Sequence, residues 1–172
     1  MKPEMVPTGI YPTEPDMDAM VNEHGDALLR MCVVYLRDVP LAEDAVQETF
    51  MRAFRAYARF RHECSERTWL TGIAINVCRS MLRSAWRRKV SVVDTLEYLG
   101  ETYDLPDTTV TEAIMRLPKR QREAVVMHYM EGLKIREIAE ALGVPLQTVS
   151  SRLKRAREAL RGELKEWYDE KG

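Results

Sequence analysis

Arginine, threonine and serine residues recur at helical spacing near the end of this chain. A helical pattern starts at residue 146, and one side of it carries Thr148, Ser151, Arg152 and Arg155. Residues three and four apart share a helix face, so these side chains point the same way. Guanidinium groups hydrogen-bond to guanine and to phosphate, and hydroxyl groups contact bases and backbone oxygens. The chemistry that this pattern favours is binding in the major groove of DNA.

Two short helical patterns hinged at Gly143 would position these side chains. The first has one apolar face, made of Ile135, Ile138, Ala139 and Leu142. The second has an apolar face opposite the arginines, made of Leu146, Val149, Leu153, Ala156 and Leu160. Ala139 is small enough for another helix to cross closely, and Gly143 permits a tight turn. The spacing predicts a helix-turn-helix whose second helix contacts DNA.

The alternative for this segment is an amphipathic helical hairpin that packs against another part of the protein, with its arginines in solvent. Residues 147–161 contain five Lys or Arg and one Glu. Solvated helix faces usually mix both signs of charge, so this excess favours DNA binding over the packed hairpin.

Length and composition favour an all-α protein of two small helical domains. The chain has 172 residues, of which 45% are hydrophobic and 31% charged, enough for one modest core or two small ones. It has neither an apolar stretch of membrane-spanning length nor an N-terminal leader. We therefore expect a cytoplasmic protein without membrane insertion.

The three cysteines are an odd number without repeated close spacing, so the sequence predicts neither a disulfide framework nor a zinc module. His62, Cys64 and Cys78 could in principle gather a metal ion. Cys32 and Cys78 lie on apolar helical faces, however, where a free cysteine is an ordinary core residue. We predict no metal and no cofactor.

Charge is strongly segregated along the chain, although the formal net charge is only −1. Residues 10–50 include two basic and nine acidic residues, residues 51–90 ten basic and two acidic, and residues 91–109 five acidic and none basic. Attraction to phosphate acts over about 8 Å at physiological salt, so local charge decides it. Different stretches therefore face different partners.

Three helical patterns precede the acidic stretch. They cover residues 17–36, 42–57 and 68–82, with apolar residues at helical spacing. The second pattern places Phe50 and Phe54 on its apolar face. Its other face displays Asp44, Gln47, Glu48 and Met51. Such a face can pair with basic residues of a partner helix, and a plain solvated acidic face is the alternative.

Three segments, in order, resemble a known family. Residues 42–54 read AEDAVQETFMRAF, residues 68–76 read TWLTGIAIN, and residues 117–123 read LPKRQRE and lead into the helix-turn-helix. Over residues 17–160 the chain resembles the extracytoplasmic-function (ECF) group of bacterial RNA polymerase sigma factors. The resemblance implies a dissociable specificity subunit that recruits bacterial core RNA polymerase to promoter DNA. It also implies control by an anti-sigma factor, membrane-anchored or soluble.

The resemblance further implies a division of the chain into parts. Residues 1–16 are a tail, residues 17–90 a domain like sigma region 2, residues 91–110 an acidic flexible linker, and residues 111–172 a helix-turn-helix domain like sigma region 4. The first domain docks on the clamp coiled coil of the polymerase and opens the minus-ten element. The second recognises the minus-thirty-five element.

Site residues follow from positions that match the family. The expected polymerase contacts are Asp44, Gln47, Glu48 and Met51. The expected contacts to the opened minus-ten strand are Phe60, Arg61, His62, Arg67, Asn76, Arg79, Arg83, Arg87 and Arg88. The expected contacts to the minus-thirty-five element are Gln147, Thr148, Ser150, Ser151, Arg152, Lys154 and Arg155.

Opening a promoter requires that an extruded base be stacked and hydrogen-bonded, which offsets a few kcal/mol of lost base stacking. The resemblance implies that a loop around residues 60–67 captures this base, because Phe60 and Asn76 occupy positions that match the family. Phe60 as a core side chain is the alternative. Two residues depart from the family pattern. Lys134 replaces the usual Ser or Thr helix cap, which is worth about 1 kcal/mol. Ser150 replaces a common Lys or Arg, so promoter preference cannot be transferred from relatives.

Other functional classes find less support in the sequence. It contains no Gly-rich phosphate loop, HExxH motif, nucleophile elbow or convergent carboxylate pair, so we predict that the protein is not an enzyme. A stand-alone DNA-binding regulator would bind a palindrome as a dimer, yet no dimerization segment is evident after residue 160. An RNA-binding or hydrolytic enzyme that used His62 and Cys64 would lack further ligands.

Overall fold

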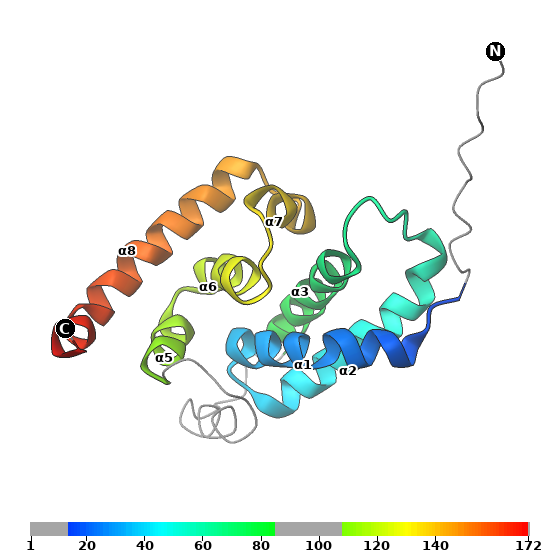
Figure 1. Cartoon of the computed structure of the whole chain (residues 1–172), viewed down its shortest axis with the longest axis horizontal. Helices are drawn as coiled ribbons and strands as arrows, with labels where there is room; N and C mark the ends of the chain where they lie inside the picture. Colours follow the sequence, from blue (N-terminus) through cyan, green and yellow to red (C-terminus); the bar gives the residue numbers. More distant parts are fainter. Residues whose placement is uncertain (1–13, 85–107, 172) are drawn as a thin grey trace, which may run out of the picture.

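The computed structural model describes residues 14–84 and 108–171, and these residues form helices joined by short loops (Figure 1). The first group comprises α1 (Met17–Leu36), α2 (Val39–Ala56), the short 3-10 helix η1 (Tyr57–Arg59) and α3 (Glu66–Ser84). The second comprises α5 (Thr108–Arg116), α6 (Lys119–Val125), the π-helical turn η2 (Val126–Met130), α7 (Ile135–Leu142) and α8 (Leu146–Lys171). The predicted all-α class is confirmed, and the part of the chain that the structure describes has no helix long and apolar enough to cross a membrane.

Several predictions from sequence fall on residues outside the described ranges. These are most of the expected tail, the expected linker up to residue 107, and the site residues Arg87 and Arg88. Helix α5 begins at Thr108, so residues 108–110, which we expected in the linker, are helical.

Capping residues determine where the first two helices begin. Asp16 accepts a hydrogen bond from the backbone N–H of Ala19 at 3.0 Å, and Asp38 accepts one from Leu41 at 2.9 Å. Arg37, between the helices, has a positive φ of 57°, and its N–H donates to the carbonyl of Val33. This left-handed residue closes α1 and lets α2 turn back against it.

The Asp38 cap supports a stability prediction. Asp38→Ala should lower the free energy of unfolding by about 1 kcal/mol, because it removes an N-cap acceptor that is almost fully buried. Urea unfolding followed by circular dichroism measures the change. Asp16→Ala, at an exposed cap, is the matched control and should cost less. Equal losses in the two variants would show that burial of the cap adds nothing.

Helix α1 lies at the centre of the described structure. Six consecutive residues, Met31 to Leu36, are buried, although a surface helix buries only one face. The reason is that α1 contacts α2 and α3 as well as α5, α6 and η2. Buried side chains of both helix groups accordingly form a single hydrophobic cluster. The two helix groups correspond to the two small helical domains that the sequence predicts, and their buried side chains form one shared core.

The surface along which the two groups meet is called the seam below. At one end of it α3 approaches α7 closely, where a Cβ added at Gly72 would lie 3.5 Å from that of Ala141. At the same end Arg67 Nε donates to Glu131 Oε2 at 3.1 Å, and Thr68 Oγ1 donates to Glu137 at 3.4 Å. The seam therefore combines apolar packing with polar contacts.

The predicted helix-turn-helix is confirmed by α7, Gly143 and α8. Gly143 ends α7 in the left-handed region with φ of 63°, a conformation that glycine adopts without strain. The buried apolar face includes Ile138, Ala139, Leu142, Val149, Leu153 and Ala156. The prediction for Leu146 was wrong, because this first residue of α8 is exposed. Lys134 makes no side-chain cap, and the Glu137 carboxylate instead accepts from its backbone N–H at 2.7 Å.

Candidate partner and nucleic-acid surfaces

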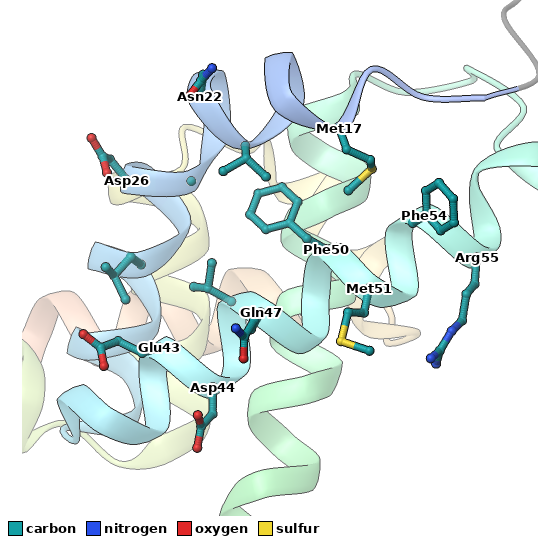
Figure 2. A pocket seen from close by; sticks show the side chains of 14 residues that line it. Met17, Asn22, Asp26, Glu43, Asp44, Gln47, Phe50, Met51, Phe54 and Arg55 are labelled. Carbon is teal, nitrogen blue, oxygen red and sulfur yellow. The ribbon is translucent and has the colours of Figure 1, made fainter.

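A groove of about 1070 Å³ runs between α1 and α2. Figure 2 shows Glu43, Asp44, Gln47, Met51 and Arg55 along its α2 side, with Met17, Asn22 and Asp26 on α1. Three of its lining residues are exposed apolar side chains, namely Val21 (43% exposed), Met51 (48%) and Phe54 (55%). Exposed apolar groups gathered in one groove are typical of a surface that binds another protein.

The charges around the groove, called the α1–α2 groove below, are mainly acidic. Asp26, Glu43 and Asp44 line it, with Arg55 as the cation among the lining residues. Apolar groups ringed by carboxylates suit an amphipathic partner helix that carries Lys or Arg beside its apolar stripe.

Three of the four residues that we expected to contact polymerase, Asp44, Gln47 and Met51, line the α1–α2 groove. The fourth, Glu48, is absent from its lining, and its carboxylate accepts from Arg52 Nε at 2.6 Å. Phe54, which we assigned to the apolar face of its helix, is instead exposed at the groove.

An aromatic cluster lies where the chain leaves α2 and enters α3. The rings of Phe60 and Trp69 are stacked, with centroids 4.4 Å apart and planes 13° from parallel. His62, with a positive φ of 55°, places its ring 4.2 Å from that of Phe60. Asn76 is exposed further along α3. Phe60 is half-buried, so its ring both packs in the cluster and keeps some surface in solvent.

The arginines expected beside the opened strand differ in their surroundings. Arg61 is exposed, with Glu63 4.0 Å away, and Arg83 is exposed near the end of α3. Arg67 contacts the second helix group, where it also donates to the carbonyl of Met130 at 3.1 Å.

Glu123 of α6 joins the two helix groups, and its carboxylate is almost fully buried. Arg79 of α3 donates from Nε to Oε1 at 2.5 Å and from Nη2 to Oε2 at 2.9 Å. Tyr35 of α1 donates its hydroxyl to Oε1 at 3.2 Å, and Arg152 of α8 donates Nη1 to Oε2 at 3.5 Å. Burial and the neighbouring carboxylate raise the pKa of Tyr35, and the hydrogen bonds to Glu123 raise the pKa of Arg79.

Two residues expected on exposed DNA-binding faces are therefore turned inward. The Arg79 side chain is 28% exposed and that of Arg152 only 13%. The prediction that Arg152 faces solvent was wrong for this arrangement, because a buried carboxylate at the seam attracts it. The sequence held only a weak signal for Glu123, which ends the segment LPKRQRE that leads into the helix-turn-helix.

The other residues of the recognition helix remain accessible to differing degrees. Gln147, Lys154 and Arg155 are exposed, and Thr148, Ser150 and Ser151 are half-buried. A surface hollow of about 580 Å³ is lined by residues of α8 and by residues at the start of α6, namely Gln147, Thr148, Ser151, Arg152 and Arg155 with Pro118, Lys119, Arg120 and Gln121. The two cations from α6 extend the basic surface beside α8, and our sequence reasoning did not include them.

Potential metal ligands come together at one place among the described residues. Glu23, His24 and Glu66 each offer a ligand atom, and these atoms lie within 4.8 Å of one another. His24 Nε2 lies 3.1 Å from Glu66 Oε1, a contact that an ordinary hydrogen bond explains. Cys78 Sγ lies 3.6 Å from Cys32 Sγ in the core, and burial raises the pKa of Cys64.

Comparisons with known proteins agree with this geometry. Residues 20–88 match the Sigma-70 region 2 family, and residues 108–160 match the Sigma-70 region 4 family. RNA polymerase sigma-H factor of Pseudomonas aeruginosa is 31% identical over 160 residues, which cover 83% of each chain. The ECF sigma factor SigC of Mycobacterium tuberculosis is 37% identical over 136 residues, covering 74% of this chain and 72% of SigC.

A solved structure also has this fold. The sigma factor RpoE of Bartonella quintana, in complex with the anti-sigma factor NepR, aligns with a TM-score of 0.70 and 23% identity over 87% of this chain and 97% of RpoE. The matches to regions 2 and 4, with a helix-turn-helix in the second, define a sigma-70-type transcription factor. The chain belongs to the ECF group of bacterial RNA polymerase sigma factors.

Proposed function

We propose that this sigma factor docks on core RNA polymerase through the α1–α2 groove. The observation that carries the proposal is the groove itself, in which exposed Met51 and Phe54 lie beside Asp26, Glu43 and Asp44. An amphipathic helix of the polymerase with basic flanks fits this combination of apolar and acidic groups.

The two halves of the chain then divide the work at the promoter. The half formed by residues 17–90 opens the minus-ten element, with the aromatic cluster and exposed Asn76 supporting capture of an extruded base. The half formed by residues 111–172 recognises the minus-thirty-five element through α8, with exposed Arg155 and the adjoining α6 cations on one basic surface. Polymerization chemistry belongs to the polymerase, so the sigma factor itself is not a catalyst, and it works in the cytoplasm.

An anti-sigma factor controls the protein in this proposal. Bartonella RpoE, which has the same fold, was solved with its anti-sigma factor NepR. The α1–α2 groove offers such a regulator an apolar surface that the polymerase also needs. Occupation of this groove would exclude the polymerase directly.

A charge-reversing variant tests the docking surface. Asp44→Arg combined with Gln47→Ala should weaken association with core polymerase about tenfold or more, because like charges would then face a basic partner. Helicity should be unchanged, since both side chains are exposed. Co-purification with core polymerase and circular dichroism measure the two effects. Glu163→Arg, an exposed site on α8, is the control; equal weakening by both variants would place docking elsewhere.

Run-off transcription with purified core polymerase tests the whole proposal. The chain should confer initiation at specific promoters on core polymerase and should by itself bind duplex promoter DNA weakly. Tight, salt-resistant binding of a palindrome by the isolated chain, without specific initiation, would instead identify a stand-alone regulator.

A further inference from the structure

A second cavity, of about 370 Å³, opens on the seam and is called the seam pocket below. Its walls come from both helix groups. Tyr35, Arg79 and Arg83 line it from α1 and α3, and Lys119, Arg120, Glu123, Leu142, Val144 and Arg152 line it from the second group. A volume of this size is that of a small-molecule site.

The charges that line the seam pocket are unbalanced. Five of the lining residues are cations, and Glu123 is the one carboxylate among them. Both oxygens of that carboxylate already accept hydrogen bonds from Arg79, and each accepts one more, from Tyr35 or Arg152. No ion pair of Arg83, Lys119 or Arg120 with a carboxylate of the described residues is observed in the structure. Arg83 from one side of the seam and Lys119 and Arg120 from the other therefore face one small cavity without an ion pair to any carboxylate that the structure describes.

We propose that the seam pocket binds a small phosphate-rich anion, such as an inorganic polyphosphate or a nucleoside polyphosphate. Contiguous phosphates would accept charge-assisted hydrogen bonds from guanidinium and ammonium groups on both sides. Leu142 and Val144 supply an apolar wall that a nucleoside could contact.

Binding of the anion also has a regulatory consequence, which rests on the proposed function. The ligand contacts α3 and α6 together, so it stabilises the closed seam. Arg79, Arg83 and Arg152 are also residues that we expect to contact promoter DNA. The anion and the promoter would therefore compete for the same side chains.

Calorimetric titration of the full chain with inorganic tripolyphosphate tests the proposal without polymerase or DNA, so its failure is distinguishable from failure of the sigma function. We expect one saturable site per chain at physiological salt. Arg83→Ala should weaken binding about tenfold or more, the effect of one lost charge-assisted hydrogen bond. The side chain is exposed, so the variant should fold, and thermal unfolding checks that it does.

Arg155→Ala is the matched control, because Arg155 lines the hollow beside α8 but not the seam pocket, whereas Arg83 lines only the seam pocket. It should leave the dissociation constant unchanged. Equal weakening by both variants, or no saturable binding, would overturn the proposal. A parallel titration with ATP distinguishes the two candidate ligands. Tighter binding of ATP than of tripolyphosphate indicates a nucleoside polyphosphate, and equal or weaker binding indicates an inorganic polyphosphate.

Discussion

Glu123→Gln should lower the free energy of unfolding by about 3 kcal/mol, the lower end of the range for a broken buried ion pair. The substitution keeps the shape of the side chain but removes the charge that holds Arg79 and Arg152 at the seam. Two guanidinium groups would then lie near each other without a carboxylate between them. The loss stays at the lower end because the partly exposed Arg79 can turn toward solvent.

Urea unfolding of the full chain measures this effect. Glu140→Gln is the control, since the Glu140 carboxylate is exposed and pairs with Arg136 across one helical turn at 3.3 Å. Loss of this exposed ion pair should lower the free energy of unfolding by no more than about 0.5 kcal/mol. An equally small loss of unfolding free energy in the two variants would show that Arg79 and Arg152 reach solvent freely. Glu123 would then not hold the two helix groups together.

Arg155→Ala should reduce promoter binding by the sigma–polymerase complex about 5- to 150-fold, which corresponds to about 1–3 kcal/mol for one specific base contact. Asn76→Ala should mainly reduce promoter opening, because in the proposed function Asn76 acts on a base that is available only after the strands separate. The two variants are compared on a fully duplex promoter and on one with a pre-melted bubble at the minus-ten element.

The bubble should rescue Asn76→Ala and leave Arg155→Ala impaired. Arg161→Ala, an exposed arginine further along α8, is the control and should behave like the unsubstituted protein on both templates. Rescue of Arg155→Ala as well as or better than Asn76→Ala would show that binding and opening are not divided between the two halves.

Local periodicity was enough to predict the helices and the helix-turn-helix. Ile138, Val149 and Leu153 are buried as their spacing predicts, because residues three and four apart share a face whatever the tertiary fold. The acidic face of α2 was predictable for the same reason. The exposure of Phe54 was not predictable, because periodicity shows on which face of a helix a residue lies but not whether another helix covers that face.

The seam could not be predicted from local patterns. Glu123 and Arg79 are 44 residues apart, and nothing in the spacing of either helix shows that their side chains meet. One signal was present and not used. Residues 31–36 are all apolar, which indicates a helix segment that is buried on every side. Such burial requires packing against helices that are distant in sequence as well as against the adjacent ones.

Because the two helix groups share a core, a partner that requires them to be apart can bind only after the seam has opened. If only one molecule in about 100 were open, the apparent dissociation constant for such a partner would be about 100-fold above the intrinsic value. Each change of about 1.4 kcal/mol in the free energy of opening the seam would then alter that apparent dissociation constant tenfold. A large side chain at Gly72, where an added Cβ would already lie 3.5 Å from that of Ala141 across the seam, would therefore raise the open fraction and with it the apparent affinity for such a partner.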